Sequence, residues 1–177
     1  MPTTDPEWRT ALSQIGEIVQ LASMLDHQLN HVVIEVLHLT KSPMLEPVVA
    51  TLEPSRKLEI LKGRLKHIKQ ADWKKAKQTY VDLVERVNKL RNIACHSQML
   101  RERDKFVFSS SQAAKLFKGL KLEGVPTVER TPLDSVINAI GVAEKALGAG
   151  QNLIENFERV QSELDRRRKK SEDNRQN

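Results

Sequence analysis

The sequence is short of several features on which common classes of protein depend. It has a single cysteine, Cys95, in 177 residues, which excludes an intrachain disulfide framework and a zinc cluster built on several thiolates. No stretch approaches the roughly 20 uncharged apolar residues that a membrane-spanning helix needs. Residues 1–7 have no basic segment followed by an apolar run, so they do not resemble a signal peptide. We therefore expect a cytoplasmic protein without a membrane segment.

Several motifs of common enzymes are also absent. The chain has no glycine-rich phosphate loop, no Ser-His-Asp order and no dinucleotide-binding fingerprint. Hydrophobic residues make up 39% and charged residues 29% of the sequence, a balance that argues against general disorder and against a membrane protein. The composition is that of a soluble globular chain, and we expect neither a cofactor nor a bound metal.

Positive charge is abundant and unevenly distributed. The net charge is +6, and residues 54–78 alone carry nine basic and two acidic side chains. A field of that sign attracts polyanions, of which nucleic acid is the commonest in a cell, although it is also typical of a solvated lysine-rich helix face. The candidate nucleic-acid-binding residues are Arg56, Lys57, Lys62, Arg64, Lys66, Lys69, Lys74, Lys75 and Lys77.

Helix signals dominate the hydrophobic pattern. Asp5-Pro6-Glu7 is typical of a helix start, with Asp5 as the cap. Apolar residues then recur three and four apart as far as Ser42-Pro43, which predicts one long amphipathic helix. The apolar stripe consists of Ile15, Ile18, Ala22, Leu25, Leu29, Val32, Val36 and Leu39.

The rest of the chain predicts further helices and one short β insert. A basic helix follows Pro54, a second runs from Asp72 to about Leu100, and a last helix begins at Thr131-Pro132. Residues 106–108 and 125–128 are β-prone and can pair as a hairpin. Gly148 and Gly150 either kink the last helix or allow close packing.

These elements predict an all-α fold, an antiparallel bundle of four to five helices with a small β-hairpin insert before the last helix. The single domain would span residues 1–165. A basic tail at residues 166–177 has no apolar side chain to bury, so we expect it to be disordered. Long helices in so short a chain often bury part of their apolar surface against a second subunit, so we expect a homodimer.

The most informative segment is Arg91-Asn92-Ile93-Ala94-Cys95-His96, near the end of a predicted helix. Asn92 and His96 are four residues apart and so share one helix face, towards which Arg91 can swing. Histidine can exchange protons near neutral pH, arginine can grip phosphate oxygens, and asparagine can orient a hydroxyl or an imidazole. The three suit RNA cleavage by the neighbouring 2′-hydroxyl, but the same residues commonly cap helices or face water.

The segment resembles the signature of the HEPN superfamily (higher eukaryotes and prokaryotes nucleotide-binding). That signature is an arginine, usually followed by a polar residue, with a histidine after four to six intervening residues, and here four residues intervene. The order of helices over residues 6–165 is similar too. The resemblance implies a dimeric bundle whose motif residues line a cleft between subunits. It also implies a metal-independent endoribonuclease in a defence or toxin–antitoxin setting, or an inactive relative that binds nucleotide, RNA or protein.

Three residues carry over from that motif. Arg91 and His96 match its defining positions and Asn92 matches the polar one, so the candidate catalytic residues are Arg91, Asn92 and His96. Cys95 matches no defining position, and we expect a small packed residue instead of a nucleophile. RNA, a second copy of the chain and a protein antitoxin or regulator are the partners that the resemblance implies.

Two other groups have the spacing of a site. His27, His31 and Glu35 are spaced by four and His38 follows three later, a pattern that can bind metal, but we expect a solvated or dimer-facing polar stripe. Trp73 and Tyr80 are seven apart and can stack a base beside the lysines or pack in the core. The favoured hypothesis is a metal-independent endoribonuclease. The alternative is a non-catalytic helical dimer that binds RNA, nucleotide or a partner protein.

Overall fold

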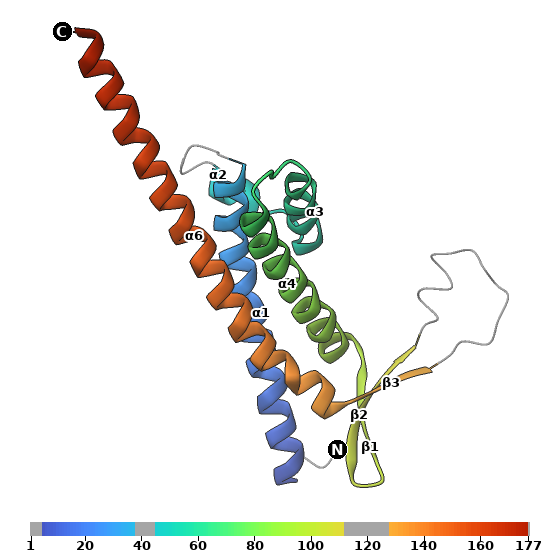
Figure 1. Cartoon of the computed structure of the whole chain (residues 1–177). Helices are drawn as coiled ribbons and strands as arrows, with labels where there is room; N and C mark the ends of the chain where they lie inside the picture. The colour runs from blue at the N-terminus through green and yellow to red at the C-terminus, as the bar shows by residue number, and fades with distance from the viewer. Residues whose placement is uncertain (1–4, 38–44, 112–127, 177) are drawn as a thin grey trace, which may run out of the picture. The chain divides into compact units, whose positions relative to one another are not determined.

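The computed structural model describes residues 5–37, 45–111 and 128–176. The helices are α1 (Pro6–Val36), α2 (Leu45–Ala50), α3 (Pro54–Leu65), α4 (Ala71–His96) and α6 (Leu133–Gln176), and the strands are β1 (Gln98–Glu102), β2 (Lys105–Ser111) and β3 (Val128–Pro132) (Figure 1). A helical fold with a small antiparallel sheet before the last helix is what the sequence predicts. None of the described helices is both long and apolar enough to cross a membrane.

The chain divides into two compact units, where the sequence predicts one domain over residues 1–165. The first, here called the sheet unit, contains residues 1–23 and 83–144, and the second, the basic unit, contains residues 24–82 and 145–177. The three long helices α1, α4 and α6 each contribute one part to each unit.

In the sheet unit, α1 begins as the sequence predicts. Asp5 caps it, because the backbone N–H of Glu7 donates to Asp5 Oδ1 at 2.9 Å. Arg101 on β1 then fixes this helix start through hydrogen bonds to the carboxylates of Asp5 and Glu7 at 2.8 and 2.9 Å. The buried core that joins α1, α4, the sheet and α6 consists of Ala11, Ile18, Ala94, Phe108, Leu133, Val136 and Ala139.

The sheet differs from the predicted hairpin. The sequence predicts that α4 continues to about Leu100, but α4 ends at His96 and β1 follows at once. β1 pairs with β2 through a two-residue turn in which Arg103 and Asp104 have φ of 46° and 60°, the left-handed pair that a type I′ turn requires. β2 pairs with β3 as well, so the insert is a three-stranded antiparallel sheet in the order β1-β2-β3.

The start of α6 shows a smaller difference. Thr131 and Pro132 belong to β3, where Thr131 pairs with Phe108, and the helix begins one residue later at Leu133. Helix ends fray, and a shift of one residue is common there. Residues 125–127, part of the predicted second strand, lie outside the described residues.

In the basic unit, the predicted apolar stripe of α1 forms the core. Leu25, Leu29, Val32 and Val36 are all buried, and Tyr80 of α4 is fully buried among the core residues. Burial raises the pKa of the Tyr80 phenol, and the negative charge of Asp26 raises it further, so this side chain stays protonated.

A buried ion pair joins α3 to α1 in this unit. Lys57 Nζ lies 2.7 Å from Asp26 Oδ1, and the Lys57 side chain is completely buried whereas that of Asp26 is 38% exposed. The prediction that Lys57 is a surface residue for nucleic acid is therefore wrong. The reason is that Lys57 precedes Leu58 on the buried face of α3, where an ammonium is tolerated only beside a counter-charge.

Gly150 marks a close approach of α6 to α1 and α4. A Cβ at this position would meet the Gln28 side chain and would lie 2.7 Å from Tyr80 Cε2. Gln28 Nε2 donates to the backbone carbonyl of Leu147 at 2.8 Å, which holds the two helices at this spacing. Of the two roles that the sequence allows for the glycines, close packing is confirmed at Gly150, whereas Gly148 faces open space.

α6 continues as a helix to Gln176, where the sequence predicts a disordered tail from residue 166. Residues 161–168 are exposed along it. Glu, Arg and Gln are strong helix formers, which accounts for a helix that continues through these exposed residues.

We predict that Gly150→Ala destabilises the protein by about 1–3 kcal/mol, because the added methyl group forces Gln28 or Tyr80 out of place. Gly148→Ala is the matched control on the same helix. Its methyl group enters open space, and it should stabilise by up to about 1 kcal/mol through helix propensity. Urea or thermal unfolding followed by circular dichroism measures both. Equal effects of the two substitutions would contradict the close approach.

Asp26→Asn should cost about 3 kcal/mol of unfolding free energy, because it leaves the buried Lys57 ammonium without a counter-charge. Glu59→Gln is the control, since it breaks the exposed pair between Glu59 and Arg56 and such pairs contribute about 0–1 kcal/mol. The same unfolding measurement applies, and a loss no larger than that of the control would show that the pair is not needed.

Candidate functional site

The candidate catalytic residues lie in the last turns of α4, within the sheet unit. Arg91 is half-buried, and Asn92 and His96 are exposed. The Arg91 Nη1 group donates a hydrogen bond to Asn92 Oδ1 at 3.0 Å, so the guanidinium does turn towards the asparagine as the sequence predicts. Because His96 follows Asn92 by one helical turn, the three polar groups occupy one accessible side of the helix end.

The apolar residues of the same segment hold this arrangement in place. Ala94 is part of the buried core of the sheet unit, and Leu90 and Ile93 pack against that core. Cys95 is exposed, so the expectation that it is a packed residue is wrong. Position 95 falls about 100° beyond Ala94 around the helix, which carries it past the buried face and into solvent next to His96.

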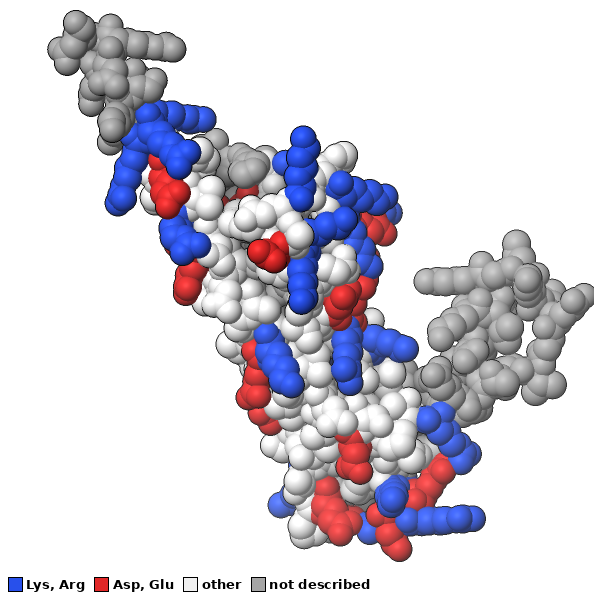
Figure 2. Space-filling view, viewed as in Figure 1, with Lys and Arg blue, Asp and Glu red and all other residues white. Residues whose placement is uncertain are grey.

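The basic segment, residues 54–78, lies entirely in the basic unit, whereas the Arg91 to His96 segment belongs to the sheet unit. The basic side chains of residues 54–78 reach the surface except for that of Lys57, and on the face seen in Figure 2 basic side chains gather over α3 and the neighbouring part of α4. Arg56 is held by Glu59 at 2.7 Å. The structure thus brings together the predicted lysines and arginines of α3 and α4, but it assigns them and the candidate catalytic residues to separate units.

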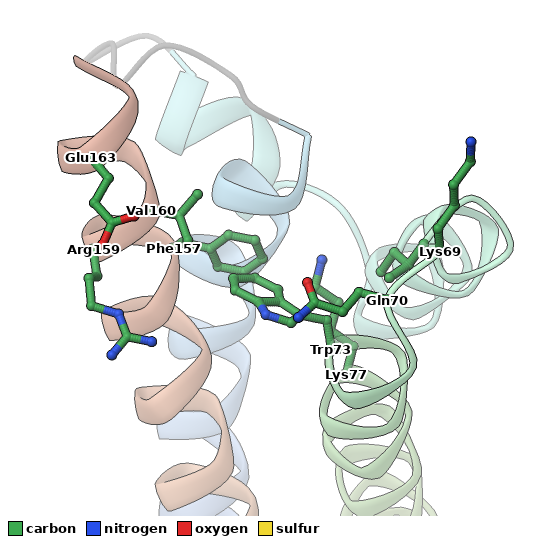
Figure 3. Close-up of a pocket in the computed structure, with 9 residues that line it drawn as sticks. Lys69, Gln70, Trp73, Lys77, Phe157, Arg159, Val160 and Glu163 are labelled. Carbon is green, nitrogen blue, oxygen red and sulfur yellow. The ribbon is translucent and has the colours of Figure 1, made fainter. Parts of the chain in front are cut away.

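A groove of about 580 Å³ opens beside these basic residues. Trp73 from α4 and Phe157 from α6 point toward each other in it, with ring centroids 5.4 Å apart and ring planes at 70° (Figure 3). Its lining combines these rings with charged and polar side chains from the same helices and from the connection before α4. The remaining lining residues are Ile68, Lys69, Gln70, Lys77, Arg159, Val160 and Glu163.

A second, smaller groove shares Ile68 and Lys77 with the first. It measures about 260 Å³ and is also lined by Val36, Arg64 and His67. Lys77 Nζ lies 4.6 Å from the centroid of the Phe157 ring and 5.6 Å from that of Trp73, within the range of a cation–π interaction. Burial lowers the pKa of Lys77, and the positive charge of Arg64 lowers it further. These neighbouring cations suit an anionic group.

The two aromatic residues that the sequence pairs as a possible stacking site behave differently. Trp73 is partly exposed and lines the larger groove, whereas Tyr80 is fully buried and cannot stack on a ligand. Phe157 and Arg159 complete the groove from α6. No sequence signal pointed to them, because they lie more than 80 residues from Trp73 and Phe157 has the spacing of an ordinary core residue.

The histidines of α1, His27 and His31, lie beside Glu46, a residue that the sequence did not suggest. His27 and His31 contact each other edge to face, with ring centroids 5.0 Å apart. The Oε1 atom of Glu46, in the first turn of α2, lies 3.7 Å from His31 Nε2. Among the described residues, the group with metal-binding geometry is His27, His31 and Glu46, and it does not include Glu35. His38 lies outside the described residues.

Comparison with known proteins adds no relative to this description. No family model, no curated protein and no solved structure matches the chain.

Proposed function

We propose that the chain is a metal-independent endoribonuclease of the HEPN type. The observation that carries the proposal is the accessible group at the end of α4, where Arg91, Asn92 and His96 share one side of the helix and Arg91 contacts Asn92 at 3.0 Å. A histidine buried in the core and hydrogen-bonded there would have favoured a structural role, but His96 is exposed.

The residue types suit attack by the 2′-hydroxyl of RNA on the adjacent phosphorus. His96 takes the proton of that hydroxyl or returns one to the departing 5′-oxygen. Arg91 stabilises the charge that develops on the phosphorane, and Asn92 orients the reacting groups. The reaction leaves a 2′,3′-cyclic phosphate and a 5′-hydroxyl, with no metal ion required.

One histidine serves only one of the two proton transfers, so the proposal includes a homodimer. A second subunit supplies a second Arg91 and His96 to the same cleft. Two large apolar side chains of α1 in the sheet unit support such an interface: Leu12 is 49% and Val19 is 41% exposed, and their spacing of seven places them on one helix face. Burial of such side chains in a second subunit would remove them from water.

We predict that the purified protein cleaves RNA in excess chelator and that His96→Ala lowers the rate at least about 100-fold, the usual contribution of a general acid or base. Arg91→Ala should lower the rate to a similar degree. Cleavage of varied single-stranded and structured RNAs is followed on gels, with the cyclic phosphate identified by mass spectrometry.

Cys95→Ser is the matched control, because Cys95 is exposed on the same turn and has no role in the proposed reaction. It should cleave at the wild-type rate. Equal cleavage by His96→Ala and the wild type, or no cleavage of any RNA by the wild type, would rule the proposal out. A monomer by analytical ultracentrifugation would remove the two-histidine mechanism.

A second candidate function is non-catalytic binding of RNA, favoured by the grooves of the basic unit. Trp73 is partly exposed, and Lys69, Lys77 and Arg159 line the same groove. Arg64 and His67 lie in the adjoining small groove. A base stacked on Trp73 with its phosphate beside these cations would use the combination typical of single-strand binding.

For this candidate we predict that Trp73→Ala weakens binding of single-stranded RNA by about 1–3 kcal/mol, the usual contribution of one stacked base. Lys69→Ala should reduce the slope of log K against log salt by about one. Lys105→Ala, which removes an exposed lysine of β2, is the control. Fluorescence anisotropy at several salt concentrations measures all three, and an affinity independent of salt would exclude this function.

A further inference from the structure

We propose that His27, His31 and Glu46 form a zinc site in the basic unit, independent of the proposed ribonuclease chemistry. Each of these residues offers one ligand atom, and the three atoms all lie within 4.8 Å of one another. Two imidazoles and one carboxylate are a common protein ligand set for Zn²⁺, with the fourth position taken by water.

The separations of these atoms suit a metal better than a direct hydrogen bond. His31 Nε2 and Glu46 Oε1 are 3.7 Å apart, whereas a charge-assisted hydrogen bond between nitrogen and carboxylate measures about 2.7–2.9 Å. In a tetrahedral site with bonds of about 2.0–2.1 Å, neighbouring ligand atoms are about 3.3 Å apart. The His31–Glu46 distance is already close to that value. The separations to the His27 ligand atom are at most 4.8 Å, and side-chain rotation at the surface shortens them when a metal binds.

The helix backbone pre-arranges the two imidazoles. His27 and His31 are one turn apart on α1, the spacing at which two histidines of one helix bind the same metal. Their rings stand at 88° to each other, so they do not stack face to face. All three side chains lie at the surface, where a metal can reach them. His27 is exposed, and the side chains of His31 and Glu46 are 44% and 49% exposed.

Glu46 is what completes the set, and it comes from another element. α2 is separated from the end of α1 by residues 37–44, and its first turn brings Glu46 to His31. Ligands from α1 and α2 mean that a bound zinc ion joins the two helices. Zinc therefore binds the folded unit in preference to the unfolded chain, and it should raise the unfolding temperature.

The test begins with protein freed of metal by chelator and then exchanged into chelator-free buffer. Titration with Zn²⁺ against a chromophoric zinc indicator should give one ion per chain. Co²⁺ should give the intense visible absorption of a tetrahedral ion. The midpoint of thermal unfolding should rise when Zn²⁺ is added.

Three single variants remove one ligand each: His27→Ala, His31→Ala and Glu46→Gln. Each should lower the zinc affinity at least about 100-fold, since loss of a residue that only supports a ligand already costs 10- to 100-fold. Each should also abolish the rise in unfolding temperature. All three residues lie at or near the surface, and circular dichroism confirms that each variant is folded before titration.

His67→Ala and His96→Ala are the controls, because both histidines are exposed and lie outside α1 and α2, His67 between α3 and α4 and His96 at the end of α4. Both should keep wild-type zinc binding, and His96→Ala separates this site from the proposed nuclease. The proposal is overturned if the wild type takes up no zinc in one-to-one ratio, or if His27→Ala or His31→Ala binds zinc as the wild type does.

Discussion

The basic unit depends on the ion pair between Lys57 and Asp26. A completely buried ammonium is unfavourable in an apolar interior unless a counter-charge lies beside it, and Asp26 provides that charge at 2.7 Å. The pair fixes which face of α3 meets α1, together with the buried Leu58, Leu61 and Leu65. The remaining basic side chains of α3 are then directed to solvent. The buried ion pair and the three leucines thus set which basic side chains of α3 face outward.

The same carboxylate also acts on the aromatic core. The charge of Asp26 contributes to the raised pKa of Tyr80, whose ring lies against the backbone of α6 at Gly150. Asp26 thus pairs with Lys57 of α3 and acts on Tyr80 of α4, and Tyr80 in turn lies close to α6. On its surface the unit carries the aromatic groove and the candidate zinc ligands, whereas the Arg91 to His96 segment belongs to the sheet unit. Features that suit ligand binding and the feature that suits RNA cleavage occupy different parts of the chain.

Sequence reasoning succeeded where the determinants are local. The cap at Asp5 and the apolar stripe of α1 follow from residue type and helical spacing. It failed where a distant partner decides. β1 carries the polar sequence QMLRE, which has no β signal of its own and becomes a strand by pairing with β2.

The site residues show the same division. The common helix face of Asn92 and His96 follows from a spacing of four, and the turn of Arg91 towards Asn92 was foreseeable. The burial of Lys57 was not, because its counter-charge lies 31 residues away. Phe157 was missed for the same reason, since it meets Trp73 only after α4 and α6 have packed. Glu46 was missed because it comes from α2, the helix after α1, and no helical spacing relates it to His31.

The close approach at Gly150 has a consequence for how this protein can vary over evolutionary time. Positions 28, 80 and 150 share one volume, and two of them already fill it. A side chain becomes acceptable at position 150 only in a background where position 28 or 80 carries a smaller residue. The order in which such changes arise then matters, because the first must shorten a neighbour before the second can occur. Descendants of this sequence should show linked substitutions at these three positions, although they are far apart along the chain.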